Sequence, residues 1–292
     1  MCERDRIDER LRSGTFDWTA NRRQFAIAAM AALGACAARP LEGGGADALA
    51  EEWVRVPTAD GVMDAFFVRP AAGRHPAVLL WPDILGVREA YQAMARRQAA
   101  EGHAVLIINH YYRAAPAPQF DRGYADFLAQ GGFDKIKPWR EALTAESIAR
   151  DAEAAIAWLD RRSEVDRKRG VGTHGYCLGG PFTVWTAAAV PRRVRAAASF
   201  HGWRLVTDDA QSPHRMLGGT KARYLFAIGQ NDDAETPEEK NILREAAAAA
   251  GRPAEVEVYP ATHGWMVPDG RAFDVAQAER GWARMRALFA RL

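Results

Sequence analysis

The sequence has little cysteine: three residues among 292, at Cys2, Cys36 and Cys177. They lie too far apart in the chain to provide the closely spaced ligands of a zinc site, so no metal is expected. Cleavage of an N-terminal segment would remove Cys2. Depending on where the cut falls, it would also remove Cys36. The folded chain then has no internal disulfide to form. Cys177 is therefore predicted to be a lone thiol whose role is chemical.

An excess of charge of either sign is also missing. Lysine and arginine total 39 against 37 aspartate and glutamate residues, a net charge of +2. The basic residues are scattered along the chain rather than gathered in a stripe, so no nucleic-acid partner is expected. The densest run, DRRSEVDRKRG at 160–170, mixes both signs and is typical of a solvated helix end.

The N-terminal region has no apolar run of the roughly 20 residues that a bilayer span needs. A shorter apolar run at 26–35 follows Arg22, Arg23 and Phe25, and small residues end it. A charged start, a short apolar run and a small-residue exit are the parts of an export signal, and the adjacent arginines resemble the twin-arginine type. The alternative is an amphipathic helix of a cytoplasmic protein. The run has no polar face, which favours export to the periplasm.

The end of this signal allows two interpretations. LGAC at 33–36 resembles a lipobox, in which Cys36 becomes the lipidated first residue and attaches the protein to a membrane. ACA at 35–37 instead fits an ordinary cleavage site. The glycine-rich LEGGGADALA at 41–50 is typical of a flexible linker. The sequence thus predicts an export signal and linker at 1–50, followed by one folded domain at 51–292.

Short apolar runs alternate with longer helical stretches from residue 53 onward. The expected strands are EWVRV, MDAFFVRP, PAVLLW, AVLIIN, VGTHGYC, AAASF, RYLFAIG and AEVEVY, and the expected helices span 88–100, 144–162, 180–189, 237–250 and 273–292. This alternation predicts an α/β fold, a mostly parallel sheet with helices on both faces. The aromatic and proline-containing stretch at 111–139 fits poorly. It is predicted to be an irregular lid or binding loop with a short helix at 123–129.

The segment GYCLGG places Cys177 where an expected strand meets an expected helix, with Gly175, Gly179 and Gly180 around it. A nucleophile at such a sharp turn has a strained backbone, and flanking glycines remove the clashes that side chains would make. The turn exposes the sulfur at a helix N-terminus, which favours thiolate. It also leaves the N–H of Leu178 as an oxyanion donor. The alternative is a buried structural cysteine beside helix-packing glycines.

Two further candidates follow later strands. Asp232 and Asp233 come after RYLFAIG, and His263 comes after AEVEVY with Gly264 behind it. Nucleophile, acid and histidine in this chain order are typical of α/β hydrolases, and the carboxyl ends of parallel strands share one edge. Asp232 lies closer to its strand and is the preferred partner of His263. Asp233 is more typical of an exposed cap or turn residue.

The motifs PAVLLWPDILGVRE, GYCLGG, GQNDD and YPATHGW together resemble the dienelactone hydrolase family of α/β hydrolases, over about 53–292. The resemblance implies that Cys177 attacks an ester or lactone carbonyl, that His263 is the base and that Asp232 orients it. It also implies that the backbone N–H of Ile84 is a second oxyanion donor. The partner implied is a small-molecule ester or lactone, and no cofactor is needed.

Other family positions transfer less completely. The family commonly has a glutamate that interacts with the resting thiol. Asp83 stands there, one methylene shorter, and is either such a thiol contact or a plain loop acid. Arg113 matches one of two regions whose arginines bind a substrate carboxylate, while GWMVPD after the histidine contains no arginine. His201 and Trp265 either face the pocket or pack in the core.

The sequence therefore predicts a hydrolase of small esters or lactones that works through a Cys–His–Asp triad and a covalent acyl-thioester. The alternative from another class is a non-catalytic lipoprotein on the same scaffold that binds a ligand or senses redox state. A peptidase or long-chain esterase of this fold is a third interpretation.

Overall fold

The computed structural model describes residues 48–292. The predicted export signal, the arginine pair and Cys36 lie outside the described residues. Within the part that is described, no helix is both long and apolar enough to cross a bilayer.

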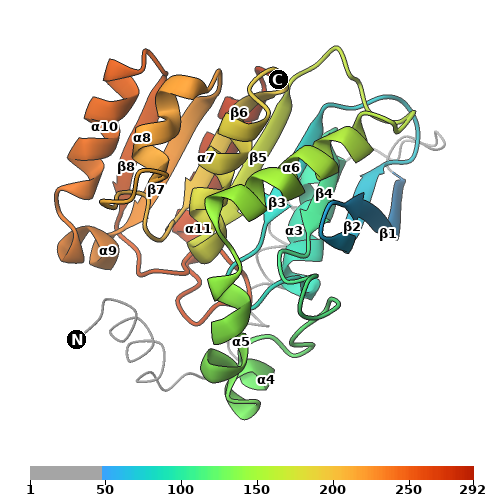
Figure 1. Cartoon of the computed structure of the whole chain (residues 1–292), viewed down its shortest axis with the longest axis horizontal. Coiled ribbons are helices and arrows are strands. Elements are labelled where there is room, and N and C mark those ends of the chain that lie inside the picture. The colour runs from blue at the N-terminus through green and yellow to red at the C-terminus, as the bar shows by residue number, and fades with distance from the viewer. Residues whose placement is uncertain (1–47) are drawn as a thin grey trace, which may run out of the picture.

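The centre of the molecule is one eight-stranded sheet, drawn in Figure 1, with the strand order β1-β2-β4-β3-β5-β6-β7-β8. Antiparallel pairing joins β1 to β2 and β2 to β4, and every later neighbour pairs in parallel. The predicted mostly parallel α/β fold is confirmed. The strands are β1 (Leu49–Thr58), β2 (Gly61–Pro70), β3 (Ala77–Trp81), β4 (Ala104–Ile108), β5 (Val171–Tyr176), β6 (Val194–Phe200), β7 (Arg223–Gly229) and β8 (Ala254–Tyr259).

Helices cover both faces of this sheet (Figure 1). One face packs against α6 (Ala145–Leu159), α7 (Gly180–Ala189) and α10 (Glu239–Ala249), and the other against α3 (Glu89–Ala100) and α11 (Val275–Phe289). Because β3 and β4 are covered on both faces, AVLLW and AVLII are buried at every position.

Shorter helices and two 3-10 turns lie in the connections between the strands. They are α4 (Tyr124–Ala129), α5 (Gly132–Glu141), α8 (Pro213–Met216) and α9 (Gln230–Glu235), with short 3-10 turns η1 (Cys177–Gly179) and η2 (Leu217–Gly219). Figure 1 shows α4, α5 and α9 beyond the ends of the strands.

The irregular lid predicted at 111–139 is wrong for its second half, which forms α5. Pro138 lies inside this helix and removes one backbone donor, which is why the sequence pattern argued against it. Aromatic packing stabilises the segment instead: the Phe127 ring meets Phe120 at 5.1 Å and Phe133 at 4.7 Å between centroids, both edge to face. Tertiary contact therefore overrides the local signal.

Candidate active site

Cys177 lies at a strained turn between β5 and α7. Its φ is +50°, a left-handed conformation that side-chain-bearing residues seldom adopt. A Cβ at Gly175 would come within 2.1 Å of the Gly179 carbonyl oxygen, and one at Gly179 would come within 2.5 Å of the Trp81 carbonyl oxygen. Both positions therefore require glycine. The turn leaves Cys177 partly exposed as a free thiol.

His263 and Asp232 are brought together by the last two strands. Gly229 and Tyr259 are register partners at the ends of β7 and β8, so the segments after them start side by side. The N–H of His263 then donates to the side-chain oxygen of Asn231 at 2.7 Å, which fixes one loop against the other. A Cβ at Gly229 would lie 2.8 Å from Asp232 Oδ2, so this glycine leaves room for the carboxylate.

The imidazole of His263 contacts both of the other candidates. Its Nδ1 lies 3.1 and 3.0 Å from the two carboxylate oxygens of Asp232, and the Cys177 side chain hydrogen-bonds the same ring. Asp233 instead pairs with Lys240 at 2.6 Å. The structure thus places Asp232, of the two adjacent acids, against the histidine.

Opposing effects act on the His263 imidazole. Burial alone lowers its pKa, because an apolar environment disfavours the charged ring. The charge of Asp232, the weaker electrostatic effect of Cys177 and the hydrogen bonds from both outweigh burial and hold the pKa well above its ordinary value. The site therefore favours a protonated imidazole beside the Asp232 carboxylate.

Replacing Asp232 with asparagine is expected to lower the pKa of His263, since the larger of the two favourable charges is lost. A histidine with a raised pKa stabilises the fold most below its unfolded pKa of about 6.5, and this contribution disappears as pH rises through the folded value. Asp232→Asn should therefore lose more stability on the acidic side of neutrality than above the folded pKa. NMR titration of the His263 ring, with denaturant unfolding at several pH values, measures both effects. An unchanged His263 pKa in the variant would contradict the assignment.

The loop after β3 presents the backbone of Ile84. The Asp83 N–H donates to the Tyr91 hydroxyl at 2.9 Å, the Leu85 N–H donates to Asp83 Oδ1 at 2.9 Å, and the Tyr111 hydroxyl donates to the Ile84 carbonyl at 3.0 Å. Among residues 48–292, the Ile84 N–H has no hydrogen-bond acceptor. The loop is thus held on both sides of one unused donor.

Leu178 provides the second predicted donor. It follows Cys177 in the 3-10 turn η1 that leads into α7. The first N–H groups of a helix have no partner within it, so they are available to an anion. The Cys177 carbonyl accepts from the Trp203 N–H at 3.0 Å, which ties this turn to the segment after β6.

Arg88 joins the Ile84 loop to the loop that carries His263. Its guanidinium donates to both oxygens of Asp83 at 2.8 and 2.9 Å, and to both oxygens of Asp269 at 2.7 and 2.9 Å. Arg88 is only 3% exposed. Burial raises the pKa of Asp83, but the charge and hydrogen bonds of Arg88 outweigh it and hold that pKa below its ordinary value. We call this arrangement the Arg88 clamp.

The clamp favours the second of the two interpretations of Asp83, a loop acid rather than a contact of the resting thiol. Its carboxylate accepts from Arg88 and from the Leu85 N–H, and the Cys177 thiol is not among its described contacts. The shorter side chain serves the loop.

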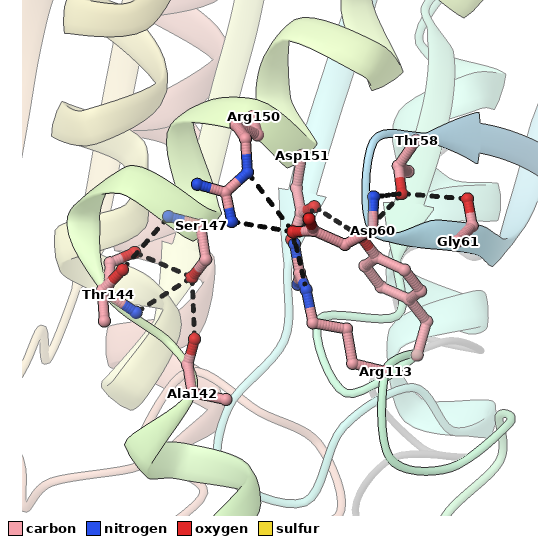
Figure 2. A network of polar contacts seen from close by, with 10 residues as sticks. Thr58, Asp60, Gly61, Arg113, Ala142, Thr144, Ser147, Arg150 and Asp151 are labelled. Carbon is pink, nitrogen blue, oxygen red and sulfur yellow. Dashed lines mark hydrogen bonds and ion pairs between the residues drawn. The ribbon is translucent and has the colours of Figure 1, made fainter.

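Arg113 is also placed differently from the expectation. Its guanidinium nitrogens donate to Asp60 at 2.6 and 3.1 Å and to Asp151 at 2.7 and 2.8 Å, and Figure 2 shows Arg113 reaching toward both acids. The network ties the β1–β2 turn and the segment after β4 to α6. A substrate carboxylate would have to displace two protein carboxylates, so Arg113 is better explained as a structural ion pair.

His201 and Trp265 are both buried beside the candidate site. The His201 ring lies edge to face on His263 at 4.9 Å between centroids, and neither of its nitrogens has a hydrogen-bond partner among residues 48–292. Trp265 stacks on Tyr259 at 4.5 Å and is fully buried. His201 thus contacts the candidate base directly, whereas Trp265 packs behind it in the core.

Sequence reasoning missed several residues that build this site. Arg88 stands within the quoted motif DILGVRE, but nothing near it in sequence indicates Asp269 as a partner. Nothing in the sequence indicates that the Tyr111 hydroxyl bonds the Ile84 carbonyl, or that the Asn231 side chain accepts from the His263 N–H. Within the described part of the chain, no group of three His, Cys, Asp or Glu side chains is arranged to hold a metal ion.

Known proteins that are similar to this chain in sequence point to one family. A sequence model of the dienelactone hydrolase family matches residues 63–292. A protein of Methylorubrum extorquens, provisionally named carboxymethylenebutenolidase, is 28% identical over 97% of both chains. An Escherichia coli K12 protein with the same provisional name is 28% identical over 83% of this chain and 88% of its own.

A solved structure extends this similarity to the fold. The crystal structure of a protein from Klebsiella pneumoniae, provisionally named a dienelactone hydrolase, matches with a TM-score of 0.70 and 26% identity, covering 84% of this chain and 100% of that chain. The resemblance predicted from the sequence motifs is confirmed. The chain belongs to the dienelactone hydrolase family and has the α/β-hydrolase fold.

Proposed function

We propose that this protein hydrolyses small esters or lactones through a Cys177–His263–Asp232 triad and a covalent acyl-thioester. The observation that carries the proposal is the position of His263, which contacts Asp232 through Nδ1 and hydrogen-bonds Cys177 at its strained turn. Nucleophile, base and orienting acid in this arrangement are the parts of a hydrolytic triad. The provisional names of the relatives, which denote lactone hydrolysis, support the same reaction class.

In the first step, the Cys177 thiolate forms a bond to the carbonyl carbon of the substrate. The carbonyl electron pair moves onto oxygen, where the N–H groups of Ile84 and Leu178 stabilise the negative charge. One such donor contributes about 3 kcal/mol in a comparable hydrolase. The carbon–oxygen ester bond then breaks, and the departing alkoxide takes a proton from the His263 imidazolium.

In the second step, neutral His263 removes a proton from water, which attacks the thioester carbonyl. The carbon–sulfur bond breaks, the acid departs and the thiolate is restored beside a protonated imidazole. Asp232 keeps Nδ1 protonated throughout, so the other ring nitrogen acts as base. No proton or electron from outside the substrates is required.

Burst kinetics test this proposal. In a Cys2→Ser, Cys36→Ser background, p-nitrophenyl acetate should release about one nitrophenol per Cys177 before slower turnover when deacylation limits the rate, and iodoacetamide should abolish turnover. The background is needed because all three cysteines of the full chain would otherwise react. Reversible peroxide modification without any turnover would contradict hydrolysis and favour a redox-sensing thiol.

We further propose that the protein acts outside the cytoplasm. The support is confined to the sequence at 22–37, where Arg22, Arg23 and Phe25 precede a short apolar run. Whether Cys36 is lipidated or removed decides between membrane attachment and a free periplasmic protein. The mass of the N-terminal peptide from the purified mature protein distinguishes the two.

A further inference from the structure

A cavity of about 560 Å³ lies on the α6 and α7 side of the sheet and reaches Leu178, the residue that follows Cys177. Trp203, whose N–H bonds the Cys177 carbonyl at 3.0 Å, also forms part of its wall. Pockets that enclose small ligands typically measure about 300–1,000 Å³, so an acetyl group would leave most of this space empty. Its size and position suit the acyl substituent of a larger ester, which we call the arm.

The wall of this cavity is aromatic. Phe182 and Trp185 stack at 5.6 Å between ring centroids with planes 21° apart, and Trp203 lies on the same lining. The Trp185 ring N–H is already used by the Gln211 carbonyl at 2.8 Å. Aromatic walls favour an aromatic guest, because ring pairs gain from offset or edge-to-face contact beyond the area they bury.

The charges of the cavity cancel. Arg140 and Arg204 contribute two positive side chains to its lining, and Glu146 and Asp209 contribute two negative ones. The Arg204 guanidinium lies over the Trp203 ring, 5.5 Å from its centroid, and so supports that wall. A balanced lining selects an arm for its apolar surface rather than for a charge of one sign.

Backbone strain is concentrated at this place. Among the described residues, the non-glycine positions with positive φ are Cys177 at +50°, His201 at +39° and Arg204 at +61°. Strain of this kind persists where the surrounding structure enforces it, commonly at functional sites. The turn after β6 therefore holds Trp203 between two strained residues, one of which contacts His263.

We propose that this cavity binds an uncharged aromatic arm of the substrate, so that the preferred substrates are arylalkyl esters or lactones rather than acetates. The inference rests on the proposed function, since it assigns the arm of an ester that Cys177 attacks. It goes further by naming the substrate class and the side chains that select it: Phe182, Trp185 and Trp203.

The test compares kcat/KM for p-nitrophenyl 4-phenylbutyrate with that for the acetate. Each fully buried methylene is worth about fourfold in rate, and we expect the arm to gain the equivalent of about two to three buried methylenes, so the ratio should be on the order of 10–100 in the wild-type protein. The octanoate ester has a similar reach without a ring and should gain less. A kcat/KM for the 4-phenylbutyrate ester at or below that for the acetate would overturn the proposal that the cavity binds the arm. An octanoate ester hydrolysed as fast as the 4-phenylbutyrate ester would overturn the aromatic preference.

Two matched variants locate the effect. Thr207→Trp places a ring in the cavity lining and should bring the 4-phenylbutyrate ratio close to one. Asp208→Trp places the same ring at the next, exposed position outside the lining and should keep the wild-type ratio. An unchanged ratio in a folded Thr207→Trp variant would overturn the proposal. If that variant fails to fold, the wild-type ester series decides alone.

Cys177→Ala separates failure of the proposed function from failure of the cavity assignment. If Cys177→Ala still hydrolyses the acetate, the proposed function fails. If hydrolysis requires Cys177 but kcat/KM is the same for the acetate and 4-phenylbutyrate esters, only the cavity assignment fails.

Discussion

Cys177→Ala is expected to lower kcat/KM for p-nitrophenyl esters by roughly 10⁴-fold or more, the scale seen when a hydrolase loses its nucleophile. The alanine has no atom that can form the acyl-enzyme, so only positioning and the oxyanion donors remain. Because alanine at φ +50° is as strained as cysteine, stability should change little. Steady-state kinetics and thermal unfolding on the same preparation measure both quantities.

Cys36→Ala is the matched control, since it removes a sulfur that the proposed reaction does not use. It should keep the wild-type rate on soluble protein. Activity retained in Cys177→Ala would show that another group performs the attack. A large loss of stability in that variant would instead indicate that Cys177 is mainly a packing residue.

Arg88→Met is expected to cause the largest loss of stability, about 3–5 kcal/mol, the usual effect of breaking a buried ion pair on one side. Methionine fills similar space but leaves Asp83 buried without its cation. The same change should lower kcat, because the Ile84 loop and the His263 loop lose the guanidinium that joins them. Urea unfolding and ester kinetics test the two effects.

Two comparisons separate the Arg88 clamp from charge in general. Arg122→Met removes a guanidinium that is 80% exposed, and its partner Asp126 keeps the backbone N–H of residue 122 as a donor at 2.8 Å, so the effect should be small beside that of Arg88→Met. Adding Asp83→Asn to Arg88→Met should restore part of the stability, since no unpaired charge then remains buried. Equal effects of Arg88→Met and Arg122→Met would contradict the importance of the clamp.

Strand positions were predictable because burial left a clear pattern. All eight strands lie where apolar or alternating runs predicted them. A run such as AVLLW is apolar at every position, which fits a strand covered on both faces and does not fit a surface strand or a loop. Missed helices have physical reasons. The α5 helix contains Pro138, which argues against a helix although Phe133 and Ile136 are buried on one face. The α9 helix is a six-residue polar segment without a buried residue, so it has no apolar face to detect.

The placement of the candidate triad was predictable because each member follows a parallel strand, and strand ends of this kind share one edge. The Arg88 clamp was not. Arg88 and Asp269 are 181 positions apart, and their pairing depends on how two loops meet after the sheet has formed. For the same reason the sequence could not show that Arg113 forms ion pairs with Asp60 and Asp151.

Acid-quenched digestion during hydrolysis of p-nitrophenyl 4-phenylbutyrate tests the central claim most directly, because an acyl group on sulfur can be located by mass spectrometry. The account predicts a 4-phenylbutyryl group on the peptide that contains Cys177, which accumulates within the burst and disappears in Cys177→Ala. Rapid turnover with the acyl group on another residue, or with none on the Cys177 peptide under conditions that preserve thioesters, would contradict it.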